Sequence, residues 1–549
     1  MLSQSAIHRV IEVLKKSLKR SLKLRLPGYL NPYYVSFLVR DIERFHVSAS
    51  AGSVFELEKQ PKRIVFCDLR VGNYKNDQTL GLPKTDEEEE EDSLIKKYSI
   101  LPLEDSNLYA FETCLWRLSE LCYRDALKRY QEKQAKKVFS PENERFKLAS
   151  FTKLPPAKFF KVKKFSAVNQ SFWKDFVKKI SKLLINLPKI TFDYVSFSVE
   201  REIKIFVNTE RRVIVQSLEV CSLFFEMFTQ TWDGSNVKQE FSLNVGDLQE
   251  VPNFRDIKEI IEEKYAKLKK LASARRLYSF SGPTLLLGGP AGLLFHETLG
   301  HRLEGDRLLE EGEINALRGL IGKKILPLDI TIIDNPKLKK LNGQTCIGSY
   351  DFDDQGVPSQ STTLFEDGVL KGFLTSRAQC YFKNFKPNGH ARSSDTHHPM
   401  SRMGVLIVKA KKTHSLEKLK EMLVREIVKQ GKPYGMIIEE TIDGETRTDA
   451  YNPQVFSGKV NYAKLVYPDG NEEVIRGLNF VGTPLQSLSQ IIAVGDKLEL
   501  DNSFCVAESG TVPVTTISPA ILLKNFELQT IEDTPVAPPF LLPKPKIKA

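Results

Sequence analysis

Apolar residues recur at the three- and four-residue intervals of amphipathic helices in several long stretches of the chain. The pattern predicts helices at residues 7–22, 108–137, 165–187 and 255–276. A further helix is expected at 416–429, where Gly431 and Pro433 follow as stop signals. In the stretch 7–22 the lysines and arginines lie off the apolar stripe, which is typical of a basic helix packed on a domain by its apolar face.

Short β-prone runs between these stretches predict strands. Runs at 34–39 and 64–66 are separated by the turn-like segments 51–53 and 60–62. Residues 194–228 alternate polar and apolar positions around 208–210, as a β-hairpin does, and 365–370 and 466–470 resemble hairpin tips. The sequence therefore predicts an α+β fold, with an N-terminal mixed sheet flanked by helices and a β-rich, barrel-like C-terminal domain.

With 549 residues the chain is too long for one ordinary core, so several domains are expected. Changes in composition along the chain suggest a basic amphipathic extension at 1–32, followed by an α/β domain at 33–150 that contains an acidic loop at 86–92 and a long helix. A central α+β domain is expected at 151–276 and a β-rich domain at 277–530. The last segment, 531–549, is rich in Pro and Lys and is expected to be a disordered tail.

Composition narrows the class of protein. Hydrophobic residues make up 41% and charged residues 27% of the chain, and no apolar run approaches the length of a membrane helix. Seven scattered cysteines favour reduced thiols, and with no secretory signal they predict a cytoplasmic location. The net charge of +11 is spread thinly and accompanies no zinc-finger, RNA-binding or helix-turn-helix pattern, so no nucleic-acid partner is expected.

The candidate metal-binding and catalytic residues cluster at 296–306, where the sequence is HETLGHRLEGD. This segment follows the apolar run 284–287 and the turn-like Gly-Gly-Pro at 288–290. Two imidazoles beside a carboxylate are typical of a zinc site. His296 and His301 are five positions apart, which places them about 140° apart on a regular helix. A single wide turn of π type, with its i to i+5 repeat, would align them, and Gly300 favours such a distortion.

A catalytic zinc site usually has three protein ligands and one position for water, so a third ligand is expected. Composition leaves the choice open among Glu304, Asp306, His397, His398, Cys346, Cys380 and Cys505.

Residues 296–306 resemble the His-Glu-x-x-x-His signature of the TldD/PmbA metallopeptidases. Other motifs resemble the same family: VGNY at 71–74, NG at 388–389, PMSRM at 399–403, RGLNFVGTP at 476–484 and VGDKLELDN at 494–502. The resemblance covers roughly residues 33–529 and is most specific from residue 282 onward.

The resemblance implies zinc ligands at His296, His301 and Cys505, with Glu297 as general base on a zinc-bound water. The PmbA branch of the family lacks the metal-binding residues, so this chain is similar to the active TldD type. The implied function is zinc-dependent hydrolysis of unfolded or extended peptides, in a homodimer or a heterodimer with a PmbA-type subunit. Two alternatives are a non-catalytic zinc-containing binding or assembly partner of a protein complex and a nucleic-acid-binding protein in which the motif is incidental.

Overall fold

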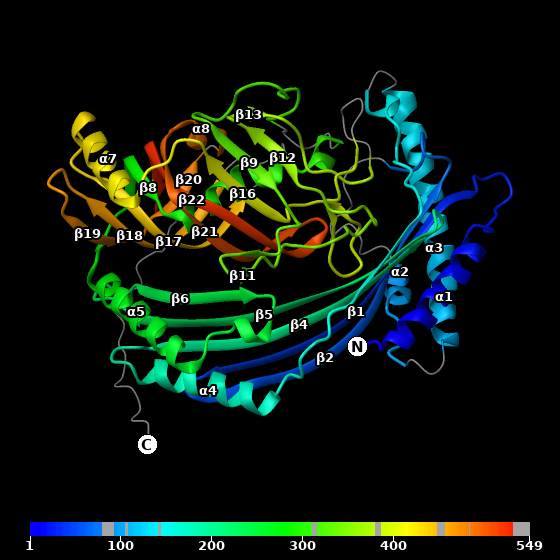
Figure 1. Ribbon diagram of the computed structural model, residues 1–549, viewed down its shortest axis with the longest axis horizontal. Coiled ribbons are helices and arrows are strands. Elements are labelled where there is room, and N and C mark those ends of the chain that lie inside the picture. The colour runs from blue at the N-terminus through cyan, green and yellow to red at the C-terminus, as the bar shows by residue number, and fades with distance from the viewer. Residues whose placement is uncertain are drawn as a thin grey trace.

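The computed structural model describes residues 1–79, 93–104, 108–140, 144–309, 316–378, 386–446, 456–482 and 484–530. The predicted acidic loop at 86–92, the predicted tail at 531–549 and Cys380 lie outside these residues. The C-terminal half of the chain lies against one face of a long, curved N-terminal sheet, and helices lie on the outer side of that sheet (Figure 1). No helix in the described ranges has both the length and the apolar character needed to cross a membrane.

The N-terminal sheet is built from very long hairpins. Its order is β2-β1-β4-β5-β3, and β6 also pairs with β5. All pairs are antiparallel except β3 with β5. The strands are β1 (Pro32–Ser50), β2 (Ser53–Val71), β3 (Ala157–Lys161), β4 (Phe192–Asn208), β5 (Arg212–Gln230) and β6 (Asn236–Val245).

Strands β1 and β4 pair continuously from Ser36 opposite Asn208 to Ala49 opposite Val195. The first belongs to the predicted domain 33–150 and the second to the predicted domain 151–276. Residues from both therefore share one sheet, and a division at residue 150 falls between strands of that sheet.

The turn predicted at 51–53 is present, whereas the turn predicted at 60–62 is not. Ala51 and Gly52 link β1 to β2 with φ angles of 51° and 73°, as a two-residue hairpin turn requires. Residues 60–62 instead continue β2, where Pro61 lies opposite Glu43. Because β2 is an edge strand, a proline without an N–H group costs the sheet little there.

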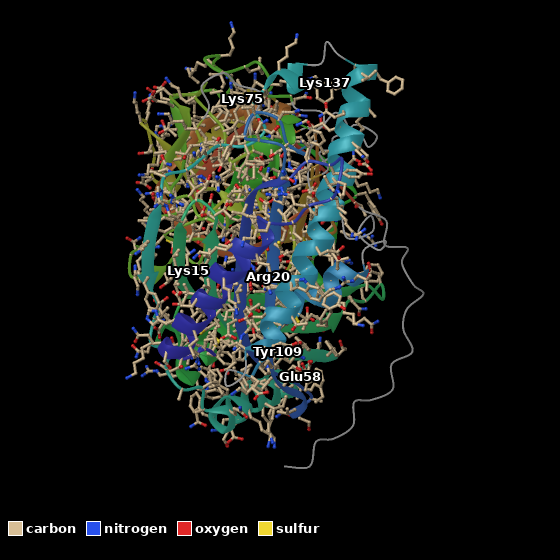
Figure 2. All side chains as sticks on the ribbon, turned by 90° about the vertical axis from the view of Figure 1, so that its right-hand side faces the viewer. Lys15, Arg20, Glu58, Lys75, Tyr109 and Lys137 are labelled. Carbon is tan, nitrogen blue, oxygen red and sulfur yellow. The ribbon has the colours of Figure 1, made fainter. Side chains whose placement is uncertain are left out.

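Helices cover the outer face of this sheet: α1 (Gln4–Ser21), α2 (Ser93–Ser99), α3 (Tyr109–Phe139), α4 (Gln170–Asn186) and α5 (Phe254–Ser273). Helix α1 buries the predicted apolar stripe, which consists of Ile7, Val10, Ile11, Leu14 and Leu18. Figure 2 shows Lys15 and Arg20 of α1 and Lys137 of α3 on the outer side of these helices. The basic character of α1 is thus that of the solvent-facing side of a packed helix.

The C-terminal domain has a sheet of twelve strands within the described residues, ordered β13-β12-β9-β16-β22-β8-β17-β18-β19-β7 with β20 and β21 attached. Strand β20 pairs with both β18 and β22, which curls the sheet, and the predicted α+β class is confirmed. The strands are β7 (Arg275–Arg276), β8 (Ser279–Leu286), β9 (Ile330–Asp334), β12 (Thr362–Glu366), β13 (Val369–Leu370), β16 (Val405–Ala410), β17 (Gly435–Thr446), β18 (Phe456–Val466), β19 (Glu472–Arg476), β20 (Asn479–Gly482), β21 (Ile491–Ala507) and β22 (Gly510–Gln529).

Smaller elements complete the domain. Two short ladders pair β10 (Lys340–Leu341) with β11 (Gln344–Thr345) and β14 (Ala391–Arg392) with β15 (Met400–Ser401). The helices are α6 (Gly288–Phe295), α7 (Leu416–Lys429) and α8 (Pro484–Ser489). Helix α7 has the predicted bounds, whereas the Gly-Gly-Pro segment predicted as a turn forms the first turn of α6, where a proline is tolerated.

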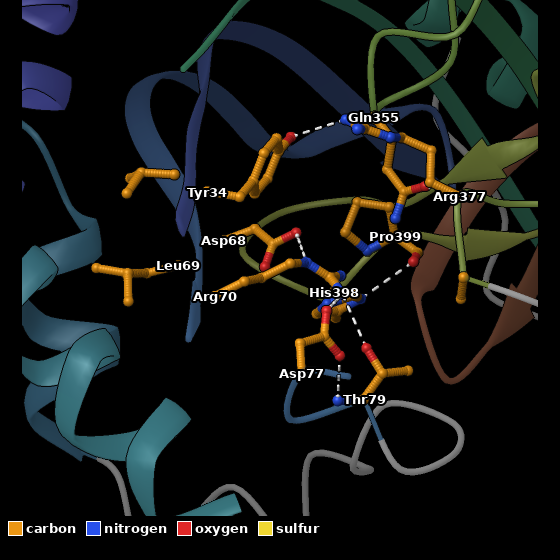
Figure 3. A network of polar contacts seen from close by, with 12 residues as sticks. Tyr34, Asp68, Leu69, Arg70, Asp77, Thr79, Gln355, Arg377, His398 and Pro399 are labelled. Atoms are coloured by element: carbon orange, nitrogen blue, oxygen red, sulfur yellow. Dashed lines mark hydrogen bonds and ion pairs between the residues drawn. The ribbon is translucent and has the colours of Figure 1, made fainter. Parts of the chain in front are cut away.

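Buried charges join the two layers. Arg377 of the C-terminal domain donates a hydrogen bond to Tyr34 Oη of the N-terminal layer at 3.0 Å (Figure 3). It also donates to Glu210 Oε1 in the same layer at 2.7 Å. The guanidinium groups of Arg377 and Arg70 lie over the ring of Phe151, at 4.1 and 3.6 Å from its centre. These contacts hold the two layers in one orientation.

A second junction lies beside a cavity of about 720 Å³ between the inner face of the N-terminal sheet and the C-terminal domain. There Asp354 accepts hydrogen bonds from Arg40 Nη2 at 3.0 Å and from Lys204 Nζ at 2.8 Å. Arg40 also donates to Glu202 Oε1 at 2.6 Å, and the side chains of Arg40 and Asp354 are both buried. Paired charges thus cross the space that separates the layers.

Candidate metal centre

Helix α6 brings the histidine motif into the core of the C-terminal domain. It follows strand β8 directly and is apolar and almost entirely buried. The residue at its N-cap position, Leu287, provides no hydrogen bond from its side chain. Instead, the carboxylate of Glu499 on β21 accepts a hydrogen bond from Gly289 N in the first turn, at 3.1 Å. The helix packs against β22, β17 and β21, and the motif that follows it lies in the core of the C-terminal domain.

The helix continues into a π turn at His296–Gly300, as the five-residue spacing predicts. The two imidazole rings lie with their centres 5.3 Å apart and their planes at 83°. A Cβ atom at Gly300 would lie 2.1 Å from Met403 Sδ, so a larger residue at the end of this turn would displace the Met403 side chain. The widened turn thus places both imidazoles on one side of the helix, which a regular α-helix would not do.

Cys505 reaches this pair from strand β21, about 200 residues further along the chain. Its Sγ atom lies 3.3 Å from His296 Nε2 and 3.4 Å from His301 Nε2. All three side chains are buried, and their potential ligand atoms lie within 4.8 Å of one another. Within the described ranges these three residues form the one such group of His, Cys, Asp and Glu side chains.

The donor atoms fit a zinc ion. Nitrogen and sulfur ligands at zinc bond lengths of about 2.0–2.1 and 2.3 Å lie roughly 3.5 Å apart around a tetrahedral ion. The observed nitrogen-to-sulfur distances of 3.3 and 3.4 Å are close to that separation. Three protein donors also leave one position for water or substrate, which is the arrangement of catalytic rather than structural zinc sites.

Glu304, one of the possible third ligands, instead supports a ligand. Its Oε1 atom lies 3.2 Å from Nδ1 of His301, and its Oε2 atom accepts a hydrogen bond from Arg307 Nε at 2.8 Å. Although burial opposes ionisation, the charges of His301 and Arg307 lower the pKa of Glu304 to about 2. Because an ionised carboxylate can only accept, Nδ1 of His301 carries a proton, and Nε2 is left available to bind a metal.

The charges around Cys505 favour its thiolate form. Although burial opposes ionisation, His301, Arg402 and His296 lower the pKa of the Cys505 thiol well below its usual value. The pKa of His301 is raised in turn, because Cys505 and Glu304 outweigh the effect of its burial. The thiolate is the form in which cysteine binds metals.

The other possible ligands have different partners. Asp306 accepts a hydrogen bond from the main-chain nitrogen of Ser401 at 2.6 Å, and His397 and His398 both bond to main-chain carbonyl oxygens through Nδ1. Cys346 lies in a separate apolar cluster. None of these four side chains belongs to the group formed by the two histidines and Cys505.

The sequence did not assign a role to two arginines that lie beside the candidate metal ligands. Arg402 is fully buried and bonds to the main-chain oxygen of Cys505, and Arg307 bonds to Glu304. The sequence carries weak signals for both: Arg402 interrupts a run of small and apolar residues, and Arg307 follows Glu304 at a spacing of three. Such signals are common on protein surfaces, so they do not identify site residues by themselves.

Part of this chain is similar to known metallopeptidases. Residues 281–530 match the family model of the PmbA/TldA metallopeptidase C-terminal domain. A metalloprotease of Methanothermobacter thermautotrophicus is 26% identical over 325 residues, which are 58% of this chain and 66% of the relative. A metalloprotease TldD homolog of Haemophilus influenzae is 28% identical over 276 residues, 49% of this chain and 53% of the relative. The chain thus matches between about half and two thirds of the length of these relatives.

Solved structures share the whole fold. The crystal structure of TldE from Thermococcus kodakarensis superposes with a TM-score of 0.62 at 16% identity and covers 95% of this chain and 99% of its own. A Thermotoga maritima protein described as a modulator of DNA gyrase gives a TM-score of 0.63 at 16% identity, covering 94% and 100%. The fold of this chain is therefore that of these two structures. Residues 281–530 of this chain are similar to the C-terminal domain of the TldD/PmbA family.

Proposed function

We propose that this protein is a zinc-dependent peptidase whose metal is held by His296, His301 and Cys505. The observation that carries the proposal is the convergence of two imidazole nitrogens and one sulfur within 4.8 Å of one another in the core of the domain. The names of the relatives support it, since they are described as metalloproteases, and a relative from Saccharolobus solfataricus is described as a zinc metalloprotease TldD homolog.

A zinc ion held there would supply Lewis acidity and make a water molecule acidic near neutral pH. Glu297 adjoins His296 on the π turn, and its buried side chain packs against Gly444 of β17. In the proposed reaction Glu297 accepts the proton of the attacking water and passes it to the leaving amine. Glu304 keeps the His301 ring oriented while this takes place.

We further propose that the substrates are unfolded or extended peptides, and that the chain works as a homodimer or with a PmbA-type subunit. Support for a partner of that kind comes from the fold of TldE, which this chain matches over nearly its whole length.

The Glu297→Gln variant tests the mechanism. It keeps the size of the side chain but removes the base, so we expect full zinc content and a 10²- to 10⁴-fold loss of cleavage of unstructured peptides. Zinc is measured by metal analysis and cleavage by mass spectrometry, with and without a chelator. Glu527→Gln, which changes an exposed glutamate of β22 in the same domain, is the control and should retain activity.

Full activity in Glu297→Gln would refute Glu297 as the base. A wild-type protein that holds zinc but cleaves no peptide would instead support a binding or assembly role for the metal.

A further inference from the structure

Arg402 connects the two chain segments that carry the proposed zinc ligands. Its Nη2 atom donates to the carbonyl oxygen of Cys505 at 2.7 Å, and Nη1 donates to Ser509 Oγ and to the carbonyl oxygen of Gly510, both at 2.9 Å. These acceptors form the tip of the β21–β22 hairpin. On its other side, Nε lies 3.5 Å from Oε1 of Glu304, the carboxylate that contacts His301.

Arg307 makes a second connection between the same two segments. Its Nε atom donates to Glu304, while Nη1 and Nη2 donate to the two carboxylate oxygens of Glu508 at 2.8 and 2.7 Å. Glu508 belongs to the turn between β21 and β22, three residues after Cys505. Glu304 is therefore shared by two arginines, each of which also holds the hairpin tip.

We propose that Arg402 and Arg307 are positioning residues that fix the Cys505 hairpin against His301 and so determine the affinity and geometry of the metal centre. The inference rests on the proposed zinc site and goes beyond its ligands. Cys505 and His301 are separated by 204 positions in the sequence, so neither secondary structure nor a short loop sets their distance.

Arginine suits this task better than lysine. Its planar guanidinium offers several donors in a fixed fork, so one side chain can hold the hairpin tip and face Glu304 at once. A lysine at position 402 would keep the charge but could not reach both sets of acceptors in one geometry. Both arginine side chains are buried, which limits the screening of these interactions by solvent.

The test compares Arg402→Lys, Arg307→Lys and the control Arg212→Lys. Arg212 is also buried and donates to the carbonyl oxygens of Gly356 and Pro155, so the control loses similar main-chain bonds without contacting either segment that carries the zinc ligands. Zinc affinity is measured by competition with a chromophoric chelator. Ligand geometry is measured from the absorption spectrum of the cobalt(II)-substituted protein, whose thiolate band reports the Cys505 sulfur.

We expect Arg402→Lys and Arg307→Lys to bind zinc 10- to 100-fold more weakly than wild type, with an altered cobalt spectrum. Arg212→Lys should match wild type in both measurements. Zinc affinity within twofold of wild type and an unchanged spectrum in both site variants would overturn the proposal.

Glu508→Gln keeps the test decisive if an arginine variant does not fold. The substitution retains the size of the side chain at the half-exposed turn but weakens the hold of Arg307. We expect a smaller loss of zinc affinity, and wild-type affinity in this variant would count against the role of Arg307. Failure of the zinc site itself looks different: wild type would bind no zinc, or His296→Ala would bind it as tightly as wild type.

Discussion

The N-terminal sheet and the C-terminal domain are stabilised in different ways. In the sheet, strands of 17 to 19 residues pair in long antiparallel ladders, and amphipathic helices cover one face. In the C-terminal domain, a π turn and the β21–β22 hairpin bring together residues about 200 positions apart, and buried arginines hold them. Apolar periodicity accounts for the first region, whereas specific polar contacts define the second.

This contrast predicts that stability and metal binding can be changed separately. Substitutions in the apolar core of the N-terminal sheet should lower stability alone, and substitutions at the π turn should lower both. Substitutions at the charged junction between the regions should have the largest effect on stability.

The largest effect is expected for Asp354→Asn at the junction. The change leaves Arg40 and Lys204 without their shared carboxylate, and breaking such a buried pair costs about 3–5 kcal/mol of unfolding free energy. Denaturant unfolding at pH 7 measures it. The control is Asp395→Asn, which removes the exposed Lys62 pair across the same junction and should cost less than about 1 kcal/mol.

This difference should shrink in acid. Although burial opposes ionisation, Lys204 and Arg40 lower the pKa of Asp354, so its contribution is complete above the usual aspartate pKa of about 3.9 and is lost as the pH falls below it. Equal stability of the variant and wild type at pH 7 would show that the junction is not held by this pair.

The next effect is expected for Leu184→Ala in helix α4. Leu184 is fully buried in the core between α4 and the N-terminal sheet, so its truncation should cost about 2–5 kcal/mol. Zinc affinity of the folded protein should stay at the wild-type value. Lys178→Ala on the exposed side of the same helix should change stability by less than about 0.5 kcal/mol. A zinc affinity that falls with Leu184→Ala would mean that the two regions are energetically coupled.

The smallest effect on stability is expected for Gly300→Ala, about 1–3 kcal/mol, because the new Cβ displaces Met403. Here zinc affinity should fall as well, since the substitution disturbs the turn between the two histidines. Adding Met403→Ala should restore part of the affinity by making room. Gly289→Ala is the control, because a Cβ there meets no atom within 4 Å. Unchanged zinc affinity in Gly300→Ala would separate the turn from metal binding.

The sequence predicted the regular parts of the fold well. Helices α1, α3, α4, α5 and α7 and the hairpin of β4 and β5 follow from periodicity and turn residues alone. Strand lengths did not follow, because Pro61 reads as a break unless the edge position of β2 is known. The division into domains did not reveal that β1 pairs with β4, since a pairing across 160 residues leaves no local pattern.

The candidate site was predictable in part. The spacing of His296 and His301 required a widened turn, because no regular helix aligns residues five apart. Cys505 could not be chosen from composition, and only the family resemblance singled it out. The roles of Glu304 and Arg402 could not be predicted, because they depend on which distant side chains meet in the folded core.

The π turn also makes the centre sensitive to residue count. Such a turn is equivalent to one residue inserted into an α-helix, and it rotates everything that follows by about 100°. Deleting Thr298 would bring the histidines to the four-residue spacing of the more familiar zinc-peptidase motif. The same deletion would swing Glu304 and Arg307 away from the hairpin that carries Cys505. A sequence that matches the more common motif better would thus form a less complete metal centre in this fold. The extra residue of the π turn is needed for the geometry of the centre.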